Sequence, residues 1–173
     1  MYRLTPKKTN NKAQSIMVVL LLAASSLMLI SALLKEVISY IWTVQLASIC
    51  FFIGAIYVVA RYLTKNFVYE IVPSERGFDL TVSESYTSRK NLVTVCRIGR
   101  QSIKRTAVLE GSAAKDELRK LKEKGRRVYD YRPDISPEKS IALLSDEGGV
   151  EVVILLAFDV ELLHYLVAED RGV

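Results

Sequence analysis

Residues 16–34 read IMVVLLLAASSLMLISALL, and residues 38–60 read ISYIWTVQLASICFFIGAIYVVA. Neither stretch contains a charged residue. A helix rises about 1.5 Å per residue, so the shorter stretch would extend about 30 Å, close to the thickness of the hydrocarbon core of a bilayer. The sequence therefore predicts two transmembrane helices, over residues 16–34 and 38–62.

Two other interpretations of these apolar segments are buried core helices and a cleaved signal peptide. Buried helices seldom run this far without a charge, and a signal peptide has a shorter apolar region followed by a small-residue cleavage site. Aromatic residues also lie near both ends of the second segment, as is typical of a membrane interface. A second apolar run directly behind the first favours a helical hairpin.

Only residues 35–37 separate the two segments, so the helices must be antiparallel neighbours. Lipid supplies no hydrophobic drive for helix association, and small side chains at such interfaces let the backbones approach closely. We therefore expect the interface to use small residues from both helices. These are Ala23, Ala24, Ser25, Ser26, Ser31, Ala47, Ser48, Cys50 and Gly54.

Basic residues flank the two segments on the side away from the link: Arg3, Lys7, Lys8, Lys12, Arg61 and Lys65. The link itself holds one base and one acid, Lys35 and Glu36. The positive-inside rule then predicts a multi-pass protein of the cell membrane with both termini in the cytoplasm. Residues 1–15 would be a basic cytoplasmic N-terminus, and residues 35–37 an extracytoplasmic turn.

The formal net charge of +5 comes from the membrane segments and their flanks. Residues 1–65 hold seven basic residues and one acid, whereas residues 66–173 hold 17 basic and 18 acidic residues. A nucleic-acid-binding domain would carry the excess itself, so we expect no nucleic-acid partner. The two cysteines, Cys50 and Cys96, fall in different regions, and no disulfide or zinc-site spacing is present.

Residues 66–173 are predicted to form a cytosolic, mainly antiparallel β domain. The segments with β-type patterning are residues 67–72, 78–82, 92–98, 102–109, 127–132, 139–144 and 150–157. A helix over residues 113–124 is expected to begin after Ser112 and to stop at Gly125. Asp159 is expected to cap a terminal helix, with an apolar stripe of Leu162, Leu163, Leu166 and Val167. The fold class is α+β, with about seven strands, an inserted helix and a C-terminal helix.

The order of four strands, helix, three strands and helix resembles a pleckstrin-homology-like (PH-like) barrel or sandwich. The segments that carry the resemblance are VYEIVPSERGFDLTV, VCRIGRQSI, VYDYRPDISPEKSIALLSDEGG and FDVELLHYL. A two-helix hairpin followed by such a domain resembles a group of uncharacterised small membrane proteins of Gram-positive bacteria. The resemblance implies a PH-like domain but no catalytic residue.

The sequence offers little catalytic chemistry. The one histidine, His164, has no sequence-near partner and is expected to be a rim residue. No phosphate loop, nucleophile elbow or dinucleotide fingerprint is present, and we expect no catalytic, cofactor-binding or metal-binding residues. An enzyme acting on a membrane-bound substrate is the alternative, and its active site would be sought at residues 129–132 (YDYR). The membrane segments lack the embedded charges that a transporter usually shows.

Residues 97–132 stand out because they hold twelve basic residues against five acids. An anionic surface could bind there, either lipid headgroups or an acidic partner. The alternative is a solvated lysine-rich helix. The candidate contact residues are Lys120, Lys122, Lys124, Arg126 and Arg127. The sequence thus predicts a membrane-anchored cytosolic binding or scaffolding module that engages the bilayer and a protein partner, a second copy or the inner leaflet, with no small-molecule substrate.

Overall fold

The structure is a computed structural model that describes residues 2–9, 11–33, 41–75, 77–86, 91–111, 113–122 and 125–167. The chain divides into two units, and each is described by itself. The helical unit is Lys8–Lys65. The β domain combines Met1–Lys7 with Asn66–Val173, so it draws on both ends of the chain.

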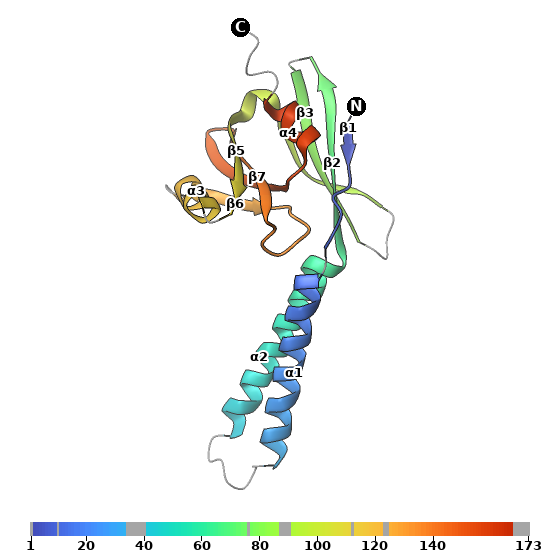
Figure 1. The fold of residues 1–173 in the computed structure, drawn as a ribbon, viewed down its shortest axis with the longest axis vertical. Coiled ribbons are helices and arrows are strands. Elements are labelled where there is room, and N and C mark those ends of the chain that lie inside the picture. Colours follow the sequence, from blue (N-terminus) through green and yellow to red (C-terminus); the bar gives the residue numbers. More distant parts are fainter. Residues whose placement is uncertain are drawn as a thin grey trace. The chain divides into compact units, whose positions relative to one another are not determined.

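The helical unit contains two long helices that pack side by side (Figure 1). These are α1 (Asn11–Leu33) and α2 (Ile41–Val58), and a π-helical turn (Val59–Leu63) continues α2. Both helices are long and apolar enough to cross a membrane. Neither has a polar face, and large side chains such as Leu29 and Phe52 are exposed on the outside of the pair. The predicted turn at residues 35–37 lies outside the described residues.

Small residues form the contact between α1 and α2. Ala24 and Ser31 on α1, and Ser48 and Ala55 on α2, are buried, and each pair is spaced by seven residues along one helix face. The Ser48 hydroxyl donates to the Ala24 carbonyl over 2.8 Å, so its polar group is satisfied inside the pair. The small-residue prediction is confirmed in part. The expected contacts that are exposed instead are Ser25, Ser26 and Cys50.

The first sheet of the β domain begins before the helices and continues after them. Its strands are β1 (Tyr2–Leu4), β2 (Lys65–Ser74), β3 (Gly77–Tyr86) and β4 (Val93–Gly99), in the order β1-β2-β3-β4. β1 is antiparallel to β2, with Tyr2 opposite Ile71 and Leu4 opposite Tyr69. The chain therefore leaves this sheet after its first strand and returns to form the second.

The described residues contain eight strands, so the prediction of about seven was wrong. The missed strand is β1, which lies in the segment predicted to be only a basic N-terminus. Three residues are too few to show an alternating pattern. Their partner strand also lies more than sixty residues away in the sequence, so no turn signal announces the pairing.

The second sheet contains β5 (Ile103–Glu110), β6 (Arg127–Asp130), β7 (Lys139–Glu147) and β8 (Val150–Ala157), in the order β5-β7-β8-β6. β7 is antiparallel to β5 and β8, whereas β6 runs parallel to β8. After α2, the chain follows the predicted order of four strands, a helix, three strands and a helix, but the first four of these strands do not form one sheet. β5 follows a 3-10 turn at Arg100–Ser102 and belongs to the second sheet.

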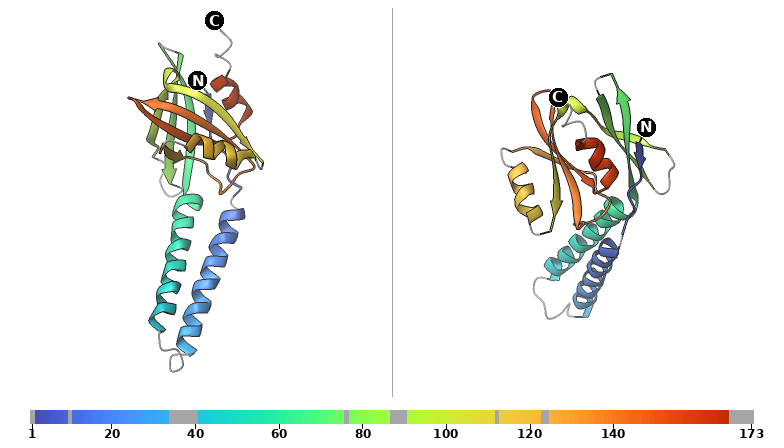
Figure 2. Two further views of the ribbon diagram at one scale, coloured as in Figure 1. Left: turned by 90° about the vertical axis from the view of Figure 1, so that its left-hand side faces the viewer. Right: turned by 45° about the horizontal axis from the view of Figure 1, so that its top comes forward.

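The second sheet is buried on both faces, which explains its unbroken apolar runs. On one face, Ile141, Leu143 and Ile154 join the main core with residues of the first sheet. On the other face, Leu144 and Val153 pack with the helix α3 (Ala113–Lys122), which lies over this face (Figure 2). A strand buried on both faces reads as continuous hydrophobic sequence rather than an alternation.

The C-terminal helix α4 (Val160–Val167) packs into the core between the two sheets (Figure 2). Leu162 and Leu166 are fully buried, whereas Val167 is exposed and does not extend the predicted stripe. Asp159 caps the helix as predicted, because its Oδ1 accepts a hydrogen bond from the Leu162 backbone N–H over 3.0 Å. The predicted cap of α3, Ser112, lies outside the described residues.

One buried tyrosine links the two sheets. The Tyr69 side chain on β2 is fully buried. Its hydroxyl donates to the Tyr131 carbonyl over 2.8 Å and accepts from the Ala157 backbone N–H over 3.1 Å. Both partners lie at the end of the second sheet. One side chain therefore satisfies polar backbone groups there and fixes the position of the first sheet against the second.

Candidate binding surfaces

Many residues of the basic stretch 97–132 form ion pairs with acids of the β domain. Arg97 pairs with Asp79 in the first sheet, at 2.7 Å. The remaining pairs are Lys104 with Asp146 and Glu151, Arg105 and Lys120 with Glu117, Arg126 with Glu151, and Arg132 with Asp130. Six of the twelve basic residues of this segment are thus engaged in ion pairs, and three of their acidic partners, Asp79, Asp146 and Glu151, lie outside it.

The five predicted contact residues have different environments. Arg126 is 12% exposed; it binds Glu151 and donates to the Leu121 carbonyl, so it fastens the end of α3 to β8. Lys120 is exposed but pairs with Glu117. Lys122 and Arg127 are exposed, and no described residue forms an ion pair with either. Lys124 lies outside the described residues.

The sequence reasoning missed two residues of the surface around Lys122. Lys115, Arg119 and Lys122 occupy positions i, i+4 and i+7 of α3, so they share one face of the helix. All three are exposed, and none forms an ion pair within the described part of the chain. We call these three residues the basic stripe. The helical spacing could have identified it, but the count of basic residues alone could not separate it from the ion-paired ones.

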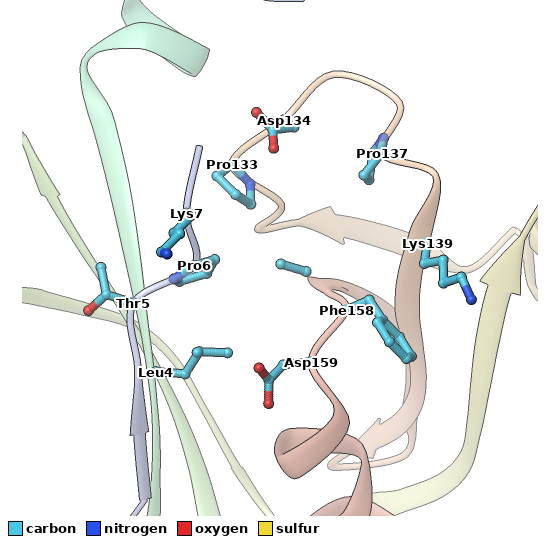
Figure 3. A pocket seen from close by; sticks show the side chains of 11 residues that line it. Leu4, Thr5, Pro6, Lys7, Pro133, Asp134, Pro137, Lys139, Phe158 and Asp159 are labelled. Atoms are coloured by element: carbon cyan, nitrogen blue, oxygen red, sulfur yellow. The ribbon is translucent and has the colours of Figure 1, made fainter. Parts of the chain in front are cut away.

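A cleft of about 400 Å³ lies at the end of β1 (Figure 3). The N-terminal segment with Leu4 and Pro6 forms one wall, and the loop with Pro133 and Pro137 forms another. We call it the proline cleft. Phe158 also lines it, so the cleft can receive an apolar side chain.

Most charged groups of the proline cleft are already engaged. The Lys139 ammonium lies 2.7 Å from Glu110 and 5.7 Å from the centre of the Phe158 ring. Asp159 accepts a hydrogen bond from the Tyr2 hydroxyl over 2.7 Å. Burial opposes ionisation of Asp159, but this hydrogen bond and those from the helix backbone outweigh it and hold the pKa of the carboxyl below its usual value. Burial and the contact with Asp159 raise the pKa of Tyr2.

A second hollow, of about 360 Å³, lies between β4 and the end of β6. We call it the tyrosine pocket. Its lining residues are Val95, Cys96, Arg97, Ile98, Gly99, Ser102, Tyr129, Tyr131 and Glu147. The rings of Tyr129 and Tyr131 are parallel, with 6.3 Å between their centroids. The Phe67 ring meets Tyr131 edge-on at 5.8 Å, which fixes one wall of the pocket against the core.

The segment 129–132, named as the place for an enzyme site, divides between two environments. Tyr129 and Tyr131 line the tyrosine pocket, whereas Asp130 and Arg132 form a bidentate ion pair with each other at 2.9 and 2.7 Å. Alternate residues of a strand face opposite ways, so the four groups do not converge. His164 is exposed on α4 and lines neither hollow.

Two groups of the tyrosine pocket, the Cys96 thiol and the Tyr131 hydroxyl, have a raised pKa and favour their protonated forms. Burial, followed by the negative charge of Glu147, raises the pKa of the Cys96 thiol to about 11. Burial and the contact with Cys96 also raise the pKa of Tyr131. A thiol with so high a pKa is a weak nucleophile at neutral pH, so this arrangement suits binding better than nucleophilic attack.

No known protein family, curated protein or solved structure matches this chain.

Proposed function

We propose that this protein is a membrane-anchored binding or scaffolding module of the cell membrane, with its β domain and both termini in the cytoplasm. Its ligand would be a protein partner, a second copy of the chain or the inner-leaflet surface. The pairing of β1 with β2 carries the proposal. These strands precede α1 and follow α2, so if one helix crosses a bilayer, the other must cross back.

The flanking charges support the cytoplasmic side for the β domain. The basic residues before α1 and after α2 outnumber those in the link, where one base and one acid cancel. The chain passes between the two units at Lys7 and Asn66, with only a few residues beyond the helix ends. Such short tethers would keep the domain at a high local concentration near the bilayer, where weak contacts become effective.

We further propose that the β domain is PH-like and that the protein resembles the small bacterial membrane proteins with such domains. The four strands of the first sheet, followed by β5, β7 and β8 and closed by α4, give four strands, three strands and a terminal helix. In this interpretation α3 and β6 are an insertion between β5 and β7. The helical hairpin would then be a second insertion, between the first two strands.

The basic stripe is the best-supported surface for an anionic contact. Each basic residue near an anionic leaflet contributes about 1 kcal/mol, and Lys115, Arg119 and Lys122 are not committed to ion pairs within the described residues. We propose that the stripe contacts anionic headgroups. If it does not, the stripe is available to an acidic protein partner.

Lysine footprinting tests the headgroup contact. The full chain is placed in nanodiscs of zwitterionic lipid, or of the same lipid with about 30 mol % phosphatidylserine, which mimics an anionic leaflet. Acetylation of individual lysines is then followed by mass spectrometry. We expect Lys115 and Lys122 to react several-fold more slowly in the anionic discs, while Lys104, held by Asp146 and Glu151, is unchanged. Equal rates at Lys115 and Lys122 in both discs would exclude the leaflet as the ligand of the stripe.

A further inference from the structure

We infer that the tyrosine pocket is a binding site for a cationic group, an ammonium or a guanidinium, held against the Tyr129 ring with Glu147 as its counter-ion. Aromatic faces attract cations within about 6 Å of the ring centroid, and a nearby carboxylate adds a direct charge contact. The inference gives the proposed binding module a ligand class and rests on that proposal.

The two tyrosine rings supply the aromatic surface. They project from alternate residues at the end of β6, Tyr129 within the strand and Tyr131 directly after it, and are parallel, with an angle of 6° between their planes. Tyr131 is fixed by Phe67 and by the core, whereas Tyr129 is 39% exposed and presents ring surface to solvent. A rigid ring backed by a core is preorganised for a ligand, because little side-chain entropy is lost on binding.

Glu147 supplies the charge. It ends β7 at the mouth of the pocket and is exposed, and within the described part of the chain no ion pair engages its carboxylate. Most other acids of this region have basic partners, including the adjacent Asp146, which binds Lys104 at 2.6 Å. The Glu147 charge also reaches the interior of the pocket, since it is among the causes that raise the pKa of Cys96.

Among the described residues, one basic residue lines the pocket, and it does not cancel this charge. The Arg97 guanidinium donates to Asp79 from Nε at 3.0 Å and from Nη2 at 2.7 Å. Both bonds end on the same carboxylate oxygen, Oδ2, and the two opposite charges of this close ion pair largely cancel. The remaining charge at the pocket is therefore that of Glu147, and it selects a cation over an anion.

Cys96 allows the sign of the charge in the pocket to be measured directly. With Cys50→Ser, Cys96 is the only thiol of the full chain. Its modification rate is measured in detergent at pH 9 with two methanethiosulfonates of similar size, one carrying trimethylammonium and one carrying sulfonate. Each rate is divided by that of a small free thiol. We expect the cationic reagent to be favoured about tenfold, as one nearby uncompensated charge would produce. Equal rates, or a faster anionic reagent, would overturn the inference.

Matched variants identify the groups responsible. Glu147→Gln should reduce the preference to less than about twofold, while Glu161→Gln, which removes an exposed acid on α4, should leave it unchanged. Tyr129→Leu should keep the charge preference. Choline, a cation that we expect to bind in the pocket and slow the modification of Cys96, should protect this variant at least threefold more weakly, because the ring and not the charge is lost. A choline effect that survives Tyr129→Leu undiminished would contradict the role of the ring.

Competitors distinguish the source of the cation. Choline should protect Cys96 and its neutral isostere 3,3-dimethylbutan-1-ol should not. A blocked Val-Lys-Val peptide is compared with Val-norleucine-Val. Protection by the lysine peptide at lower concentration than choline would assign the pocket to a side chain of a partner protein, and the reverse order to a free small amine. Failure of both cations would overturn the inference. The measurement needs no membrane, so it fails or succeeds independently of the proposed topology.

Discussion

At the scale of single residues, the buried polar contacts between the sheets are the most sensitive points of the β domain. Tyr69 is the clearest case, because its hydroxyl has two partly buried partners at the end of the other sheet. Removing a group that leaves buried partners unsatisfied costs more than the net value of the hydrogen bond itself. Such residues are therefore expected to dominate the response of this domain to mutation.

Tyr69→Phe should lower the free energy of unfolding by about 1–3 kcal/mol, because the Ala157 N–H and the Tyr131 carbonyl lose their buried partner. The measurement is denaturant unfolding of the full chain in detergent, followed by near-ultraviolet circular dichroism. Tyr129→Phe is the matched control, since the Tyr129 side chain is partly exposed, and should change stability by less than about 0.5 kcal/mol. Equal effects of the two substitutions would contradict the bridging role.

Asp159→Ala should destabilise the domain by about 0.5–2 kcal/mol at pH 7, because the cap of α4 and the acceptor for Tyr2 are both lost. The pKa of Asp159 lies below its usual value in the fold, so its stabilising contribution is present above about pH 4 and disappears as the pH falls further. The difference between the two proteins should therefore shrink in acid. Unfolding curves from pH 7 to pH 3 check this, with Glu75→Ala as an exposed control. A constant difference would contradict the assignment.

Residue roles could be predicted from the sequence only where they depend on local chemistry. Asp159 was predicted as a cap because capping involves residues three apart in the chain. The partners of the basic residues could not be predicted, because Arg97 meets Asp79 and Arg126 meets Glu151 across strands. For the same reason the sequence did not reveal the tyrosine pocket, which joins residues of β4, β6 and β7.

At the scale of elements, the strands and helices with a clear hydrophobic period were predicted at the right places in the chain, but some bounds differ: α1 begins at Asn11 rather than at residue 16, and β3 ends at Tyr86 rather than at residue 82. β3 shows the alternation that places Phe78, Leu80 and Val82 in the core. β7 and β8 were found as continuous apolar runs, although their two buried faces became evident only with α3 in place. The pairing of strands was less predictable, because the order within a sheet depends on contacts between distant segments.

β1 gives an element-scale prediction. Its register with β2, continued beyond Leu4, would bring Lys7 opposite Asn66. We therefore replace residues 8–65 by a Gly/Asn linker of about four residues, a length within the range of hairpin loops. This linked form should fold as a water-soluble β domain. Residues 66–173 alone lack β1 and should be less stable. The Tyr2 ring on β1 contacts the Tyr165 ring on α4, with 5.2 Å between the ring centroids. This contact would be lost with the strand.

Thermal unfolding and solubility of these two proteins are the measurements. We expect a melting temperature for the linked form that is higher by about 4–8 °C for each kcal/mol that β1 contributes. The linked form with the substitution Tyr2→Ala should have a melting temperature between those of the linked form and of residues 66–173 alone. Equal melting temperatures for all three would mean that β1 adds nothing to the domain.

At the scale of the whole molecule, the two units of the chain have different surfaces. The helical unit exposes apolar side chains on all sides and is apolar and long enough to cross a membrane, whereas the β domain has its own core and a surface of ion pairs. The apolar character of the two helices could be read from the sequence alone. That the β domain is completed by the segment before the helices could not, because β1 carries no pattern of its own.

The central claim is that the chain leaves the β domain after β1, crosses the membrane twice and returns at β2 on the cytoplasmic side. The most direct test places a reporter at the C-terminus, either one that is active only in the cytoplasm or one that is active only outside, and compares each with the same reporter inserted at residue 36. We expect cytoplasmic activity at the C-terminus and external activity at residue 36. External activity at the C-terminus would contradict the cytoplasmic placement of the β domain. External activity at both positions would also contradict the double crossing, because β1 and β2 would then lie on opposite sides of the membrane and could not pair.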